Sequence, residues 1–214
     1  MSGRRAAATL LALGALLGAG CGDDDEQAER PATPATPALP AKVLDQLREG
    51  RSVLVFRHAT TENASFEQEV LGDCAQQRGL SVRGQEEARR IGRAIRAAEI
   101  PIGDVRASPM CRTRDTAQLM FGRVTVDRDL VTPGMVGEEA DDMRRVRILR
   151  RLADTPPSGT GNTVLVTHTG NIGGAFDNES VLESGALLFE PDGDGRPSAP
   201  TRIDPDAWEA LAPG

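Results

Sequence analysis

Short apolar segments that alternate with amphipathic helices most strongly constrain how this chain can fold. Residues 53–56 and 164–166 are apolar runs rich in β-branched residues, which are typical of buried strands. Between them, residues 81–98 and 138–153 carry apolar residues at helical spacing. Strands that alternate with helices predict crossover connections and a parallel sheet. We therefore expect an α/β three-layer sandwich with a mostly parallel central sheet flanked by helices.

The same patterns predict the remaining elements. Strands are expected over residues 52–57, 104–107, 124–130, 163–167 and 186–190. Helices are expected over residues 42–49, 81–98, 109–121 and 138–153, with a last short helix that starts at Asp204-Pro205. A long polar loop is expected over residues 59–79.

The N-terminus predicts export. Arg4 and Arg5 precede an apolar run over residues 6–20, and small residues lead up to Cys21. This pattern is typical of a secretory signal. The small residues before Cys21 also resemble a bacterial lipobox, although Gly18 stands where Leu is usual. We expect residues 1–20 to be a lipoprotein signal peptide and Cys21 to be lipidated. The alternative is an ordinary signal peptide followed by an unrelated cysteine.

Residues 21–40 are acidic and proline-rich, which predicts a disordered tether because such a segment cannot bury a core. Residues 41–214 would then form the folded domain. We expect the protein to be exported and held at the bacterial cell envelope by lipid on Cys21, in the periplasm or on the outer face of a membrane. No internal stretch approaches the roughly 20 apolar residues of a membrane span.

Cys74 and Cys111 remain as a pair once Cys21 is lipidated. In an oxidising compartment such a pair favours a disulfide, and two buried free thiols are the alternative. Two histidines and three cysteines without a repeated spacing argue against an ordinary structural zinc site. We expect no metal and no cofactor.

The charge of the chain argues against nucleic acid as a partner. The 214 residues include 25 Lys and Arg against 32 Asp and Glu, a formal net charge of −7. A nucleic-acid-binding face needs positive charge to neutralise phosphates. The sequence gives no indication of an oligomeric state.

Both histidines of the chain, His58 and His168, directly follow predicted strands. In parallel sheets ligands bind beyond the carboxyl ends of strands, so the two imidazoles are expected to face one crevice. Arg57 adjoins His58, and Arg112 follows the strand predicted over residues 104–107. Arginine forks match phosphate oxygens, and a neutral histidine can attack phosphorus. The sequence therefore predicts a site for a phosphorylated substrate or phosphate.

Three segments resemble motifs of the histidine phosphatase superfamily, which has the phosphoglycerate-mutase-like fold. The resemblance covers about residues 52 to 190. Its segments are Arg57-His58-Ala59, Ser108-Pro109 with Arg112 and Thr116-Ala117, and the strand that ends at His168. The family usually has Arg-His-Gly at the first motif, and Arg-His-Ala is an accepted variant.

The resemblance implies a role for each matching residue. His58 would be the nucleophile that becomes phosphohistidine, and Arg57, Arg112 and His168 would line the phosphate pocket. Thr61, three residues after the nucleophile, matches a Ser or Thr that contacts phosphate in many members.

The resemblance leaves the general acid open. One branch carries an Asp directly after the late histidine, and Thr169 stands there. The other branch uses a Glu about 25 residues after the pocket arginine, which makes Glu138 and Glu139 candidates. They are equally well explained as first-turn residues favoured by a helix dipole. Glu183 is a third candidate, and some small members manage without an acid.

The expected function is a metal-independent phosphomonoesterase that acts through a phosphohistidine on His58. The alternative is a catalytically weak or inactive envelope module that keeps the phosphate pocket and binds a phosphorylated ligand or a partner.

Overall fold

The computed structural model describes residues 39–64, 69–132, 134–135, 139–194 and 196–211, all within the unit Thr36–Gly214. The predicted signal peptide, Cys21 and nearly all of the predicted tether lie outside the described residues. Within the described ranges, none of the helices combines the length and the apolar character that crossing a membrane requires.

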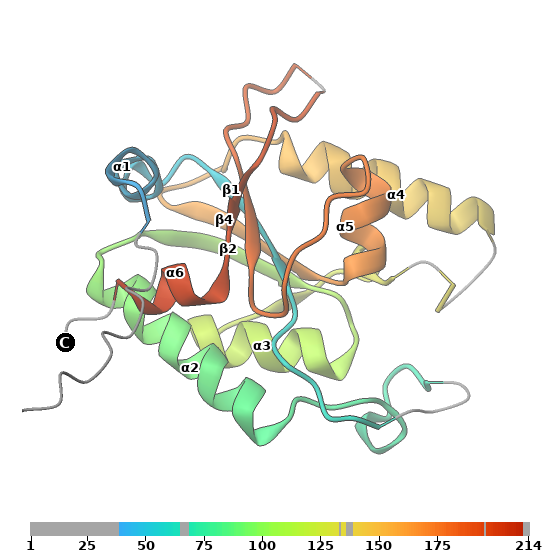
Figure 1. Ribbon diagram of the computed structural model, residues 1–214. Coiled ribbons are helices and arrows are strands. Elements are labelled where there is room, and N and C mark those ends of the chain that lie inside the picture. Colours follow the sequence, from blue (N-terminus) through green and yellow to red (C-terminus); the bar gives the residue numbers. More distant parts are fainter. Residues whose placement is uncertain (1–38, 65–68, 133, 136–138, 195, 212–214) are drawn as a thin grey trace, which may run out of the picture. The chain divides into compact units, whose positions relative to one another are not determined.

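A six-stranded sheet forms the centre of this unit, with the strand order β3-β2-β4-β1-β5-β6 (Figure 1). The first four strands in that order are mutually parallel, and β5 is antiparallel to both of its neighbours. The sequence prediction of a mostly parallel sheet is therefore confirmed. The strands are β1 (Val53–Arg57), β2 (Ile102–Ala107), β3 (Thr125–Val126), β4 (Asn162–Thr167), β5 (Ala186–Phe189) and β6 (Thr201–Ile203).

Helices pack on both faces of the sheet, which gives the three-layer arrangement that the sequence predicts (Figure 1). One core cluster lies between the sheet and the helices α1 (Ala41–Glu49), α2 (Val82–Ala97), α3 (Cys111–Phe121) and α6 (Pro205–Glu209). The other lies beneath α4 (Glu139–Ala153) and α5 (Thr169–Ala175). Short 3-10 turns at Cys74–Gln76 and Arg128–Leu130 complete the described elements.

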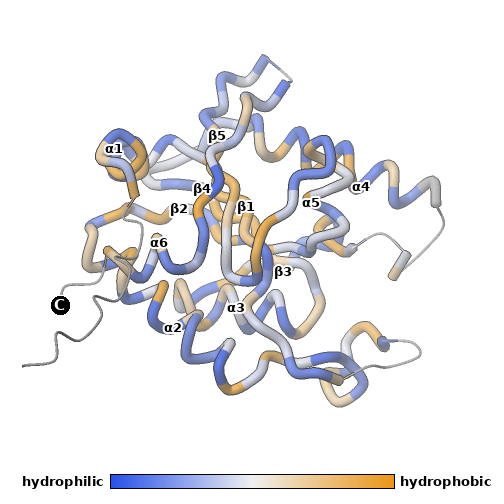
Figure 2. The backbone as a smooth tube through the Cα atoms, viewed as in Figure 1, coloured by the Kyte–Doolittle hydropathy of each residue, from blue (hydrophilic) through white to orange (hydrophobic). Residues whose placement is uncertain are grey.

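The central strands are apolar on both faces because each face is covered, as expected for buried parallel strands. In β1, Leu54 and Phe56 pack into the first cluster, whereas Val53 and Val55 pack into the second. Phe56 stacks on the fully buried Trp208 of α6, with ring centroids 5.5 Å apart. Figure 2 shows this hydrophobic centre and the more hydrophilic loops around it. The carboxyl-terminal ends of β1 and β4 are therefore anchored by well-packed core residues on both faces of the sheet.

The structure corrects two details of the predicted elements. The strand expected over residues 124–130 is only β3, because Asp127 accepts a hydrogen bond from the Asp129 amide and starts a 3-10 turn. Strand β6 is not among the expected elements, since its three residues form no apolar run and it gains its order by pairing with β5.

Candidate active site

The two histidines meet at the carboxyl ends of neighbouring parallel strands, as predicted. Arg57 at the end of β1 is in register with Thr167 at the end of β4, and the His58 amide donates to the Thr167 carbonyl at 3.1 Å. The imidazole centroids of His58 and His168 are 5.5 Å apart, and both residues are buried. This proximity follows from strand order, because β1 and β4 are adjacent in the sheet.

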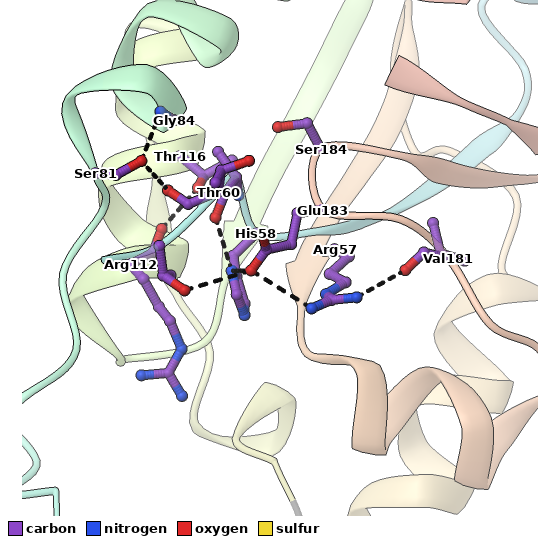
Figure 3. A network of polar contacts seen from close by, with 12 residues as sticks. Arg57, His58, Thr60, Ser81, Gly84, Arg112, Thr116, Val181, Glu183 and Ser184 are labelled. Atoms are coloured by element: carbon purple, nitrogen blue, oxygen red, sulfur yellow. Dashed lines mark hydrogen bonds and ion pairs between the residues drawn. The ribbon is translucent and has the colours of Figure 1, made fainter. Parts of the chain in front are cut away.

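The His58 ring is oriented by the backbone. Its Nδ1 lies 2.9 Å from the Ala59 carbonyl oxygen, which can only accept, so Nδ1 carries the proton. Nε2 then keeps its lone pair. The Ala59 amide donates to Thr116 Oγ1 at 2.9 Å, which ties the turn after β1 to helix α3 (Figure 3). The matching residue Thr116 therefore supports the backbone that aims the imidazole.

Burial keeps both imidazoles neutral at physiological pH. It lowers the pKa of His58 from its ordinary 6.5 to about 3, and the nearby Arg112 and Arg57 add to this effect. The pKa of His168 lies well below its ordinary value, again mainly through burial, with further contributions from Arg112 and His58. A neutral His58 is the form that can act as a nucleophile.

His168 is held by Ser108, which directly follows β2. His168 Nε2 lies 2.9 Å from Ser108 Oγ, and both side chains are buried. The same hydroxyl accepts from the Met110 amide at 3.4 Å, so its own proton can be donated to Nε2. A neutral imidazole that accepts at Nε2 carries its proton on Nδ1. His168 can therefore donate a hydrogen bond from Nδ1.

Arg57 and Thr61 converge on Glu183, the third of the carboxylates considered in the sequence. Arg57 Nη2 lies 3.4 Å from Glu183 Oε1, and the Thr61 hydroxyl donates to the same oxygen at 3.3 Å. That oxygen is 4.0 Å from His58 Nδ1. The other end of the Arg57 guanidinium donates to the Val181 carbonyl at 3.1 Å (Figure 3). Glu183 thus lies on the Nδ1 side of the imidazole.

Arg112 stands in the first turn of α3 and is paired with Glu69, a residue that the sequence analysis did not select. Arg112 Nη1 donates to both carboxylate oxygens, at 2.8 and 2.9 Å. Burial lowers the pKa of Arg112 from its ordinary value, and Glu69 opposes that shift. Arg78 lies near the site as well, since its charge contributes to the lowered pKa of both histidines.

The predicted disulfide between Cys74 and Cys111 is present, with Cα atoms 5.7 Å apart. It joins the loop after β1 to the first residue of α3. Gln77 reinforces the junction: its side-chain carbonyl accepts from the Cys111 amide at 2.8 Å, and its amide donates to the Val70 carbonyl at 2.8 Å. We call residues 69–80 the tethered segment. Once Cys74 is paired with Cys111, this segment must lie beside Arg112.

A second polar network connects helix α2 to the loops around His58. Glu87 of α2 is buried and accepts from the Thr60 and Ser184 hydroxyls, both at 2.9 Å. Ser184 has a φ of +63°, a backbone conformation that is strained for a residue with a side chain, and its amide donates to the His58 carbonyl at 3.1 Å. Glu87 therefore joins the turn after β1 to the loop that carries Glu183.

Helix α2 can approach the His58 turn closely because Gly84 has no side chain. A Cβ atom there would lie 1.9 Å from the Thr60 carbonyl oxygen. The same carbonyl accepts from the Ser81 amide at 3.0 Å, and Ser81 Oγ caps the helix by accepting from the Gly84 amide (Figure 3). The cap and the glycine together fix the start of α2 against the turn that follows His58.

The structure does not test the other two carboxylates. Glu138 lies outside the described residues, and of Glu139 only the backbone at the start of α4 is described. Glu69, Arg78 and Glu87 are the charged residues that the sequence analysis missed. The predicted disulfide was the one signal that could have indicated Glu69 and Arg78, because it brings their segment to α3.

Other features lie next to or apart from the site. A hollow of about 470 Å³ adjoins it through Thr60 and Glu183, and arginines and carboxylates line its walls. Within the described residues, Asp154, Asp192 and Asp194 have carboxylate oxygens within 4.8 Å of one another and could hold a cation, but none of them takes part in the histidine site.

Residues 53–132 match the family model of the histidine phosphatase superfamily (branch 1). The matched segment contains Arg57, His58 and Arg112, whereas His168 lies beyond its end. No curated protein matches the chain.

Solved structures of phosphatases share the fold. One is the protein histidine phosphatase SixA in complex with tungstate, with 15% identity, a TM-score of 0.51 and coverage of 72% of this chain and 97% of that one. Another is a putative α-ribazole-5′-P phosphatase from Escherichia coli K-12, with 14% identity, a TM-score of 0.53 and coverage of 72% and 95%. The sequence match to the superfamily is confined to residues 53–132. The structural likeness confirms the predicted phosphoglycerate-mutase-like fold.

Proposed function

We propose that the protein is a phosphomonoesterase that forms a phosphohistidine on His58. One observation carries the proposal: a neutral imidazole, fixed through Nδ1 by the Ala59 carbonyl, faces His168 among arginine side chains. Neutrality and a free Nε2 are what a nucleophile requires. Arg57, Arg112 and His168 supply the positive charge and hydrogen-bond donors that a phosphate dianion needs.

The reaction has two steps. In the first, His58 Nε2 attacks phosphorus, the P–N bond forms, and the ester P–O bond breaks as its electron pair leaves with the alcohol or phenol oxygen. In the second, water attacks phosphorus and the P–N bond breaks with its electron pair returning to Nε2. The protons of the water leave with inorganic phosphate or pass to solvent, which restores neutral His58. In both steps the negative charge on the three equatorial oxygens is stabilised by the two arginines and by the His168 Nδ1 proton.

The position of Glu183 bears on the substrates. Its nearer oxygen is turned toward Arg57, Thr61 and the Nδ1 side of His58, whereas the leaving group departs on the Nε2 side. Glu183 is therefore poorly placed to protonate a leaving oxygen. We infer a preference for leaving groups that need little protonation, such as aryl phosphates, acyl phosphates and phosphohistidine.

Export and lipidation belong to the proposal and rest on the sequence alone. A signal over residues 1–20 followed by Cys21 supports a lipid anchor on the outer side of a bacterial membrane. Incorporation of radiolabelled palmitate by the wild type, lost in a Cys21→Ala variant, tests the anchor. Labelling that is equal in both proteins would overturn it.

Hydrolysis of an aryl phosphate tests the enzymatic proposal. We expect turnover that vanadate inhibits, that continues in the presence of EDTA and that is lost in a His58→Ala variant. A base-stable, acid-labile phosphoenzyme should form after rapid quenching. Binding of vanadate without turnover and without a phosphoenzyme would instead favour the non-catalytic envelope module.

A further inference from the structure

The pairing between Arg112 and Glu69 is unusual in its geometry. Both carboxylate oxygens accept from the same nitrogen, Nη1, at 2.8 and 2.9 Å. Within the described part of the chain, the buried Nε of Arg112 has no hydrogen-bond partner. The edge of the guanidinium that carries Nε and Nη2 is one of its two-pronged donors, and it matches two phosphate oxygens. Glu69 therefore occupies one corner of the guanidinium and leaves this fork to a ligand.

Glu69 is itself held in place by its own segment. The Arg78 amide donates to Glu69 Oε1 at 2.7 Å. The neighbouring Val70 carbonyl accepts from the Gln77 side chain, and Gln77 in turn accepts from the Cys111 amide. The Glu69 side chain is only 11% exposed, and that of Arg112 only 4%. The carboxylate therefore contacts Arg112 from a fixed position.

We propose that Glu69 is a positioning residue that orients Arg112 for phosphate. This inference rests on the proposed function, because it assigns Arg112 to the phosphate pocket. Glu69 holds Nη1, and this fixes the rotation of the guanidinium so that its Nε–Nη2 edge faces the phosphate oxygens. Fixing a donor before the ligand arrives lowers the entropic cost of binding.

The competing interpretation is that Glu69 imitates phosphate and must leave before a substrate can bind. Two observations argue against it. A phosphate mimic would span the two-nitrogen fork, whereas Glu69 uses one nitrogen. Among the described residues, Glu69 also makes no hydrogen bond or ion pair with Arg57 or with either histidine, so it does not occupy the centre of the site. The two interpretations predict opposite changes in affinity.

A Glu69→Ala variant separates them. We expect KM for an aryl phosphate and the inhibition constant of vanadate to rise about 10-fold to 100-fold, with a smaller change in kcat. Glu69→Gln keeps one acceptor oxygen and should fall between the wild type and Glu69→Ala. The matched control is Glu86→Gln, an exposed glutamate of α2, which should leave both constants unchanged.

Binding of inorganic phosphate in the His58→Ala background, measured by calorimetry, makes the inference independent of turnover. Weaker binding when Glu69→Ala or Glu69→Gln is added supports it, and unchanged or tighter binding overturns it. If Glu69→Ala does not fold by circular dichroism, the Glu69→Gln measurement decides. A wild type that binds phosphate without turnover contradicts the proposed function, and the binding comparison still tests Glu69.

Discussion

The candidate site has two halves that are built by different means. His58, His168 and Arg57 stand at or just after the ends of β1 and β4, two adjacent strands buried on both faces. Glu69 and Arg78 belong to the tethered segment, which has no strand or α-helix of its own and is fixed to α3 by the Cys74–Cys111 disulfide. The first half is held by the core. The second is held mainly by the disulfide, by a few side-chain contacts and by the backbone bridge between Thr61 and Leu80.

This difference assigns different tasks to the two halves. Attack on phosphorus tolerates little displacement, so a nucleophile gains from a rigid base. Orientation of a pocket arginine can be supplied from a loop, provided that the loop is anchored close to it. We therefore expect changes in the strand-end half to abolish catalysis, and changes in the tethered segment to weaken substrate binding while chemistry continues.

The largest effect is expected in the strand-end half. His58→Ala should lower kcat for an aryl phosphate by at least about 10³-fold, because no other described residue offers a neutral nucleophile at this position. The measurement is steady-state turnover together with phosphoenzyme trapping. A variant that keeps more than a tenth of the wild-type kcat would show that chemistry does not depend on this half.

Reduction of the disulfide should affect mainly the tethered segment. Since the two cysteines are 37 positions apart in the sequence, loss of the bond should cost about 3 to 4 kcal/mol of unfolding free energy. KM should rise about tenfold, because Glu69 is no longer held beside Arg112, while kcat changes less. Urea unfolding and kinetics with and without a reductant measure both effects.

Cys74→Ser provides the control, because it should behave like the reduced wild type and be insensitive to the reductant. If thiol titration confirms reduction of the wild type and KM remains the same, then the segment stays in place without its covalent anchor, and the distinction between the halves weakens.

A smaller effect is expected from Arg78→Ala. Its charge acts on both histidines from the half-buried edge of the site, so its removal should raise KM about twofold to fivefold. The exposed Arg89 of α2 is the matched control, and Arg89→Ala should leave KM unchanged. Equal effects of the two variants would mean that only net charge matters.

The smallest change is expected from pH. Because burial lowers the pKa of His58 to about 3, the imidazole stays neutral as the pH falls from 7 to 5, and the nucleophile is not lost in this range. Any decline in kcat/KM should follow the second ionisation of the phosphate ester, near pH 6. Profiles of kcat/KM for esters with different phosphate pKa values distinguish ionisation of the ester from ionisation of His58. An acid limb fixed near pH 6.5 for every ester would contradict the lowered pKa of His58.

Some of the site could be predicted because it depends on local pattern. Apolar runs followed by His58 and His168 mark strand ends, and parallel strands place such ends at one edge of a sheet. Cys74 and Cys111, the pair left once Cys21 is lipidated, predicted the disulfide that the structure contains. Glu183 could be proposed only as one of three carboxylates, because the loop that carries it is positioned by the Glu87–Ser184 contact and not by any periodicity.

The rest could not be predicted, because it depends on contacts between residues far apart in the sequence. Glu69 and Arg112 are 43 positions apart, and their pairing requires the path of the loop between Thr61 and Leu80, which the bridge between these two residues closes. Strand β6 likewise gains its order only from pairing with β5.

The sequence by itself determined the α/β fold, the strand ends that carry both histidines, the disulfide pair and the arginines beside the site. These follow from hydrophobic period, from strand direction and from the chemistry of each side chain. Only the tertiary structure decided that β1 and β4 are neighbours, that Ala59 fixes the tautomer of His58, and that Glu69 occupies one corner of Arg112. Each of these is a contact whose partners are selected by packing and hydrogen-bond geometry in the folded chain.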